Sequence, residues 1–171
     1  ILHVGTTPNK NLERHLDAIR GICCEFVLIG APSQEQRKLL DGSGLDWIAL
    51  SELSEVQMVE QYQTFDLLLF ASTYEGFGLP IVEAQAVGRP VVTSYISSMP
   101  EVAGDGACIV NPFDVGSIRA GVLRVIGDHD YRLSLVENGF KNVKRFDARK
   151  ISHEYAMIYR EVADGACLRG Y

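Results

Sequence analysis

The sequence predicts an α/β fold: a Rossmann-like, three-layer αβα arrangement with helices on both faces of a parallel sheet of about six strands. Short apolar runs alternate with amphipathic stretches along the whole 171-residue chain. The apolar runs are short enough to be strands buried on both faces of a sheet. Because each run leads into a helix-like stretch, the chain reads as consecutive βαβ units, which build parallel sheets.

The first half of the chain contains three such units. Strands are predicted at residues 1–5, 25–29 and 45–50, and helices at 11–22, 33–40 and 55–63. Helix 11–22 has apolar residues at helical spacing, and Ser33 can cap the next helix. Ser54 and Gln57 form a capping box that opens helix 55–63.

The second half continues the pattern and ends in helices. Strands are predicted at residues 67–71, 91–93 and 108–110, and helices at 80–87, 114–126, 130–144 and 147–163. Pro80 suits the first turn of its helix, where a missing N–H costs nothing. Each of the three closing helices begins with an Asp that can cap it.

Length and composition predict one domain over residues 1–171. Apolar residues make up 47% and charged residues 22%, which excludes a disordered tail or a coiled coil. The net charge of −6 disfavours binding of nucleic acid through the overall field, although one phosphate can still be held locally. The chain starts at Ile1, inside an apolar run, so we expect it to be part of a longer chain.

Several residues that could carry chemistry are predicted to be structural. Cys23, Cys24, Cys108 and Cys167 have the spacing of neither a disulfide framework nor a zinc site, which favours a reducing cytoplasm. His3 is predicted in a strand, and His15, His129 and His153 are predicted on helix surfaces. Packing is predicted for Tyr131, Tyr155 and Tyr159, and a turn is predicted at Ser97 and Ser98.

The loop after the first predicted strand is a candidate phosphate site. Gly5 lets the backbone turn and a ligand approach. Lys10 stands at the entry of the following helix, where free N–H groups and the helix dipole already favour an anion. The alternative is an ordinary loop with a solvated lysine.

The loop after the fourth predicted strand, EGFGLPIVEA at residues 75–84, is the second candidate. The backbone amides of Gly78 and Leu79 would point out of a helix start and cradle a phosphate. This loop lacks the third Gly of a dinucleotide fingerprint, and the chain has no P-loop Gly-Lys-Ser/Thr.

Two carboxylates flank that helix start. Glu83 lies on an otherwise apolar helix, so burial among apolar neighbours is expected, and a buried carboxylate needs partners. Ribose hydroxyls can supply the hydrogen bonds, and Glu75 would then reach hydroxyls beyond the diphosphate. The alternative is that Glu83 only complements the helix dipole and Glu75 is a solvated loop charge.

The segment Glu75…Glu83 resembles the Glu-x7-Glu signature of retaining nucleotide-sugar glycosyltransferases with the two-domain GT-B fold. More narrowly, it resembles the C-terminal domain of glycosyl transferases group 1, also called family 4. ILHVG…KN, GRPVVTS, MPEVAGDGA and VNPFD follow in the family's order along nearly the whole chain. The resemblance implies the C-terminal, donor-binding half of a GT-B fold, with an N-terminal acceptor domain outside this chain.

The resemblance also implies roles for individual residues. Glu83 would bind the ribose, Glu75 the transferred sugar, and the backbone of Phe77, Gly78 and Leu79 the diphosphate and sugar. Lys10, beside the strand-end Gly5, would neutralise the departing diphosphate, and the base contact would come from near Leu50. The family often carries an Arg before the lysine, where this chain has Thr6, Thr7, Pro8 and Asn9.

The function implied is sugar transfer from a UDP- or GDP-sugar to a glycan, polysaccharide or lipid-linked sugar. The resemblance implies no metal and no cofactor besides the donor. It implies a cytoplasmic protein, with peripheral association at the inner face of the membrane as a further expectation for the full-length chain. Two alternatives stay open: a non-catalytic sugar-nucleotide-binding module of the same fold, and a pure interaction domain.

Overall fold

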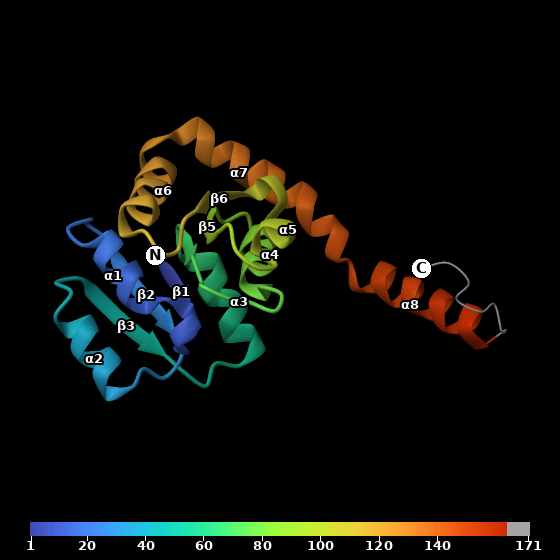
Figure 1. Ribbon diagram of the computed structural model, residues 1–171, viewed down its shortest axis with the longest axis horizontal. Coiled ribbons are helices and arrows are strands. Elements are labelled where there is room, and N and C mark those ends of the chain that lie inside the picture. Colours follow the sequence, from blue (N-terminus) through green and yellow to red (C-terminus); the bar gives the residue numbers. More distant parts are fainter. Residues whose placement is uncertain (164–171) are drawn as a thin grey trace.

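A computed structural model describes residues 1–163, which form one parallel sheet covered by helices (Figure 1). The strands run in the order β3-β2-β1-β4-β5-β6. They are β1 (Leu2–Val4), β2 (Glu25–Ile29), β3 (Asp46–Leu50), β4 (Leu68–Phe70), β5 (Val91–Ser94) and β6 (Ala107–Val110). All five strand pairs are parallel, as the sequence predicts.

The strand order reverses between β1 and β4. The chain builds outward from β1 to β3, returns to β4 beside β1, and then continues to β6 on the other side. The loops that follow β1 and β4 therefore start from neighbouring strand ends. In open parallel sheets such a reversal is where ligands bind, outside the carboxyl ends of the strands.

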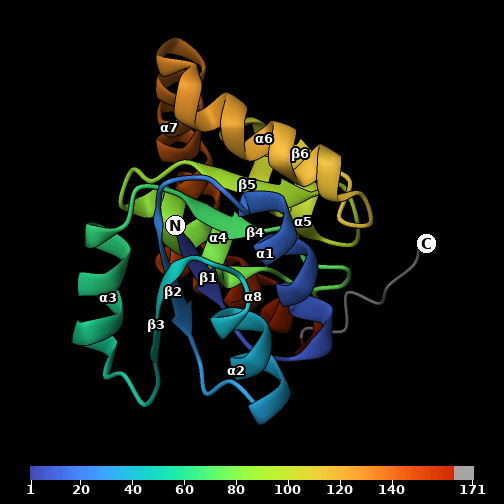
Figure 2. The same cartoon turned by 90° about the vertical axis from the view of Figure 1, so that its left-hand side faces the viewer.

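Helices cover both faces of the sheet, and Figure 2 shows α3 on one side and α1 and α2 on the other. The helices are α1 (Leu12–Ile19), α2 (Gln34–Asp41), α3 (Glu55–Thr64), α4 (Leu79–Ala86), α5 (Met99–Ala103), α6 (Val115–Gly127), α7 (His129–Asn142) and α8 (Ala148–Ala163). Short 3₁₀ turns occupy Pro8–Lys10, Gly104–Gly106 and Val143–Phe146. Helix α5 and the 3₁₀ turns are not predicted by the sequence pattern.

Strand β4 shows why the core has two halves. Leu67, Leu69 and Ala71 pack in the core with α1 and α6, whereas Leu68 and Phe70 pack in the core with α3, α4 and α5. Because successive strand residues point to opposite faces, a fully apolar run buries both.

The helix starts confirm most of the predicted caps. Ser33 and Ser54 each form a complete capping box, with Gln36 and Gln57 respectively. The prediction for α7 was wrong, because Asp128 rather than Asp130 accepts the hydrogen bond from the Tyr131 amide. Both residues are aspartates two positions apart, so the pattern could not separate them.

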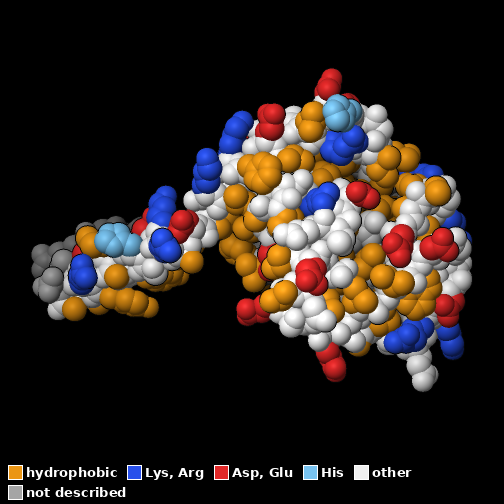
Figure 3. All heavy atoms as spheres, turned by 180° about the vertical axis from the view of Figure 1, so that it is seen from behind, with side chains coloured by type: hydrophobic (Ala, Val, Ile, Leu, Met, Phe, Trp, Pro, Cys, Tyr) orange, Lys and Arg blue, Asp and Glu red, His pale blue; other side chains and the backbone are white. Residues whose placement is uncertain are grey.

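Helix α8 extends away from the body of the molecule (Figure 1), and hydrophobic side chains gather along one side of it (Figure 3). Tyr155 and Tyr159 are 57% and 68% exposed, so the packing role predicted for them was wrong in the described chain. Their spacing is that of an apolar helix face, but α8 has no buried residue within the described chain. No helix in residues 1–163 has the length and apolar character needed to span a bilayer.

Candidate functional site

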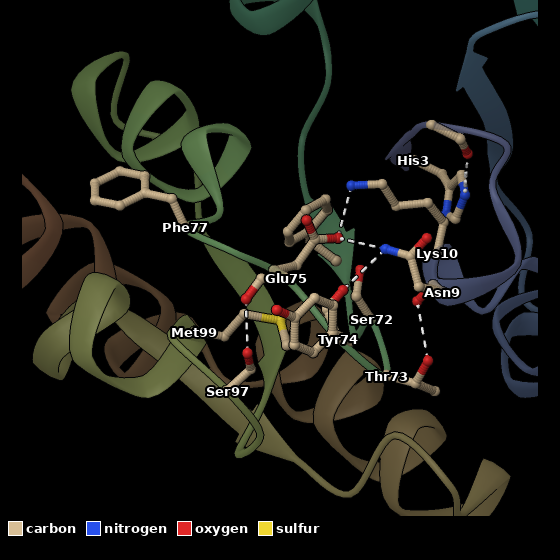
Figure 4. A network of polar contacts seen from close by, with 12 residues as sticks. His3, Asn9, Lys10, Ser72, Thr73, Tyr74, Glu75, Phe77, Ser97 and Met99 are labelled. Atoms are coloured by element: carbon tan, nitrogen blue, oxygen red, sulfur yellow. Dashed lines mark hydrogen bonds and ion pairs between the residues drawn. The ribbon is translucent and has the colours of Figure 1, made fainter.

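Lys10 and Glu75 meet at the reversal point of the sheet. The Lys10 Nζ donates to Glu75 Oε1 at 2.6 Å, and the two side chains are only 17% and 12% exposed (Figure 4). Lys10 ends the 3₁₀ turn after β1, and Glu75 belongs to the loop after β4. The structure thus brings together the two side chains that the sequence places in separate loops.

Gly5 makes room for the lysine. Its φ of +98° is in the left-handed region, and a Cβ there would lie 2.7 Å from Lys10 Cε. The Lys10 stem therefore lies against the backbone of Gly5, and Nζ lies 4.6 Å from the centre of the Phe70 ring. A side chain at position 5 would therefore displace Lys10, which gives the glycine a structural reason.

Asn9 joins the loops after β1 and β4. Its Nδ2 donates to the Tyr74 carbonyl oxygen at 2.9 Å and lies 3.4 Å from Glu75 Oε1. In return, the Thr73 N–H donates to the Asn9 carbonyl oxygen at 2.8 Å. These contacts hold the loop that carries Lys10 against the loop that carries Glu75 (Figure 4).

The loop after β5 holds the same segment from the other side. The Ser97 hydroxyl donates to the Glu75 carbonyl oxygen at 2.6 Å. The Ser98 hydroxyl lies 2.8 Å from the Phe77 carbonyl oxygen and 3.0 Å from that of Glu75. Ser97 and Ser98 form a turn, as predicted, and their hydroxyls fasten the Glu75–Gly78 segment.

Helix α4 begins directly after this segment. Gly78 is its N-cap with φ +103°, and Pro80 lies in the first turn. The first N–H groups of a helix have no partner inside the helix, so this start is available to an anion. The Phe77 ring packs edge-to-face on Phe146 with the centroids 5.6 Å apart, and Figure 4 shows it pointing away from Glu75.

Glu83 lies on α4, and its surroundings differ from those expected. The side chain is exposed, so the prediction of a carboxylate buried among apolar neighbours was wrong. Helix α4 buries Ile81, Ala84 and Gln85 and turns Glu83 outward, which composition alone does not reveal. The Tyr62 hydroxyl of α3 donates to Glu83 Oε2 at 2.7 Å.

His15 is also buried, so its predicted place on a helix surface was wrong. Its Nδ1 lies 2.9 Å from Nδ1 of His3, and His3 Nε2 lies 2.9 Å from the Gly5 carbonyl oxygen. Burial lowers the pKa of both imidazoles, that of His15 to about 4. The two rings therefore form a neutral pair beneath the loop that carries Lys10.

The family model described as "Glycosyl transferases group 1" matches residues 1–128 of this chain. The chain belongs to this family. The O-antigen chain mannosyltransferase B of Escherichia coli is 32% identical over 171 residues, which cover 93% of this chain and 45% of that protein. The chain therefore spans about half the length of the curated relatives it matches.

Solved structures share the fold of this group 1 glycosyltransferase chain. Sucrose-phosphate synthase from Thermosynechococcus elongatus matches with a TM-score of 0.86 at 22% identity, over 96% of this chain and 45% of that one. Anabaena Alr3699/HepE, solved in complex with UDP and glucose, matches with a TM-score of 0.83 at 21% identity, over 94% and 47%. These matches confirm the predicted three-layer half of a GT-B fold.

Four residues that contact the candidate site residues were absent from the predicted set: Asn9, Tyr62, Ser97 and Ser98. The signal for Asn9 was its place beside Lys10. No local signal marked Tyr62, because its contact partner Glu83 lies on another helix, 21 residues further along the chain. Leu50, predicted near the nucleotide base, is the last residue of β3. Strand β3 lies two strands from β1, and Leu50 lies at its carboxyl end.

A hollow of about 680 Å³ lies at the amino-terminal ends of the strands, and Cys23, Glu25 and Asp66 are among the residues that line it. These residues flank the amino-terminal ends of β2 and β4. Because parallel sheets bind ligands at the carboxyl ends of their strands, we place the candidate site at Lys10 and Glu75 instead.

Proposed function

We propose that this chain is the donor-binding half of a retaining glycosyltransferase that uses a nucleoside-diphosphate sugar. The observation that carries the proposal is the Lys10–Glu75 ion pair of 2.6 Å beside the start of α4. A diphosphate needs positive charge and N–H donors, and a sugar needs hydrogen-bond acceptors. Family membership supports sugar transfer, and the complex of HepE with UDP and glucose supports a nucleotide sugar as donor.

The proposed roles follow from position. Lys10 and the backbone of Phe77, Gly78 and Leu79 bind the diphosphate, and Glu75 binds the transferred sugar. As the bond between sugar and phosphate loosens, negative charge grows on the leaving diphosphate. A fixed ammonium and a helix start that face this charge stabilise the transition state and lower the barrier.

Glu83, one turn further into α4, binds the ribose hydroxyls in this proposal. A carboxylate accepts hydrogen bonds from two neighbouring hydroxyls, whereas it repels a phosphate. The exposed position of Glu83 leaves it accessible to such a ligand. Leu50, near the end of β3, remains the proposed neighbour of the base.

The proposal places the acceptor site in a second domain outside this chain. The relatives are about twice as long as the segment they share with it, which supports this division. By this account residues 1–171 alone transfer almost no sugar. A glycan, polysaccharide or lipid-linked sugar is the proposed acceptor, and the mannosyltransferase relative supports a polysaccharide setting.

Calorimetry of the full-length protein with UDP, GDP and ADP tests the proposal. We expect at least one of them to bind and the corresponding sugar nucleotide to support transfer. Lys38→Ala, on the exposed surface of α2, serves as the control for Lys10→Ala. Absence of binding to all three contradicts the proposal. Binding with no transfer to any acceptor favours the alternative of a non-catalytic module.

A further inference from the structure

Tyr62 connects α3 to the proposed ribose contact. Its ring is 3% exposed and packs edge-to-face on Phe65, with the centroids 5.7 Å apart. Its hydroxyl reaches the edge of the core and lies 2.7 Å from Glu83 Oε2. A buried and packed aromatic ring thus ends in a donor that touches an exposed carboxylate.

The direction of this hydrogen bond is set by chemistry. Burial raises the pKa of the Tyr62 hydroxyl, and the hydrogen bond and charge of Glu83 raise it further, so the phenol keeps its proton. The phenol donates and the carboxylate accepts. An ionised carboxylate has about four acceptor positions on two oxygens, so Oε1 remains available for a ligand.

A free glutamate on a helix surface samples several rotamers, and ordering it on binding costs conformational entropy. A hydrogen bond from a fixed ring removes part of this cost before the ligand arrives. We infer that Tyr62 is a positioning residue that holds Glu83 ready to accept hydrogen bonds from the vicinal hydroxyls of a ribose. This inference rests on the proposed role of Glu83.

A purely structural role is the competing explanation. A buried tyrosine hydroxyl needs an acceptor, and Glu83 supplies one whether or not it binds a ligand. In that case removal of the hydroxyl alters stability alone. A positioning role instead alters binding only of those ligands that carry the ribose hydroxyls.

The test compares two ligands in the full-length protein. Calorimetry measures the dissociation constants of UDP and of 2′,3′-dideoxy-UDP, and of the corresponding GDP pair, for wild type and Tyr62→Phe. Phenylalanine keeps the buried ring and deletes only the hydroxyl. Tyr155→Phe, which deletes an exposed hydroxyl on α8, is the matched control.

We expect Tyr62→Phe to weaken binding of the preferred ribonucleotide about three- to tenfold, because Glu83 must then be ordered when the ligand binds. Binding of its dideoxy counterpart stays unchanged, and so does the thermal midpoint to within a few degrees. Equal weakening of both ligands, or an unchanged ribonucleotide affinity, overturns the inference.

The failure of this inference can be told apart from that of the proposed function. If the wild-type protein prefers ribonucleotides and Tyr62→Phe keeps that preference, only the role of Tyr62 is overturned. Wild type that binds ribonucleotides and dideoxynucleotides equally overturns the ribose role of Glu83, and the inference falls with it. Wild type that binds none of the four ligands overturns both as well.

Discussion

The two glutamates of the Glu-x7-Glu segment are held in opposite ways. Glu75 is 12% exposed, pairs with Lys10, and lies in a segment fastened by residues from the loops after β1 and β5. Glu83 is exposed, and the contact described for its carboxylate is the Tyr62 hydroxyl. The fold thus fixes the group proposed for the sugar and leaves accessible the group proposed for the ribose.

This difference indicates which properties a mutation changes at each glutamate. Around Glu75, each change disturbs several contacts at once, so the effects on catalysis and on stability are mixed. Around Glu83, single atoms can be removed with little effect on the rest. The following predictions test this contrast, beginning with the largest effect.

Lys10→Ala removes the positive charge from the Glu75 region. In the full-length protein we expect kcat to fall about 10²–10³-fold, the loss typical of removing one group that stabilises a developing anion. Steady-state kinetics with the donor identified by calorimetry provide the measurement. A kcat that matches the control Lys38→Ala contradicts the catalytic role of Lys10.

Glu83→Ala removes the accessible carboxylate. We expect nucleotide affinity to fall about 10- to 100-fold, as for a lost hydrogen-bonded charge worth about 1.5–3 kcal/mol. Glu83→Gln keeps an acceptor oxygen for Tyr62, so its thermal midpoint stays nearer that of wild type. Calorimetry and thermal unfolding of both variants check this, and unchanged affinity in Glu83→Ala contradicts the assignment.

The neutral histidine pair beneath the Lys10 loop predicts a loss of stability in acid. The pKa of His15 is about 4 in the folded protein, against an ordinary value of 6.5. Between these values the unfolded chain binds a proton that the folded chain does not, so stability is complete above pH 6.5 and falls as the pH is lowered. For His15 alone the expected loss from pH 7.5 to pH 5 is about 2 kcal/mol, and the lowered pKa of His3 adds a loss in the same direction.

Thermal midpoints measured from pH 7.5 to pH 5 provide the check. His15→Gln should flatten the dependence on pH, whereas His129→Gln, at an exposed site, should leave it as in wild type. Equal slopes in wild type and His15→Gln contradict the explanation.

Ser98→Ala loosens the attachment of the Glu75–Gly78 segment and is expected to have the smallest effect. Loss of the hydroxyl that contacts the Phe77 and Glu75 carbonyl oxygens should cost about 1 kcal/mol of stability. KM for the donor should rise a few-fold while kcat changes little. Ser152→Ala, on the exposed surface of α8, is the control, and a KM equal to that of this control counts against the fastening role.

The sequence predicts the sheet and most helices because their signals are local. An apolar run such as Leu67–Ala71, or a capping box such as Ser54 with Gln57, carries its structure within a few residues. The site was predicted in part for the same reason, since Lys10 and Glu75 each follow a recognisable strand. Their contact at 2.6 Å required the strand order, which brings β1 beside β4.

The errors about burial share one cause, which is that burial depends on what packs against a helix. Glu83 lies on an apolar helix yet faces outward, whereas His15 lies on a polar helix yet is fully buried against His3. Tyr155 and Tyr159 have helical spacing but lie on a helix that leaves the body. Cys167, predicted to belong to neither a disulfide framework nor a zinc site, lies outside the described residues, so that prediction stays open.

A crystal structure of the full-length protein with UDP or GDP tests the central claim most directly. The account predicts a diphosphate within hydrogen-bonding distance of Lys10 Nζ and the amides of Gly78 and Leu79, with the ribose hydroxyls on Glu83. A nucleotide seated instead in the hollow beside Cys23 and Asp66, at the opposite edge of the sheet, would contradict it.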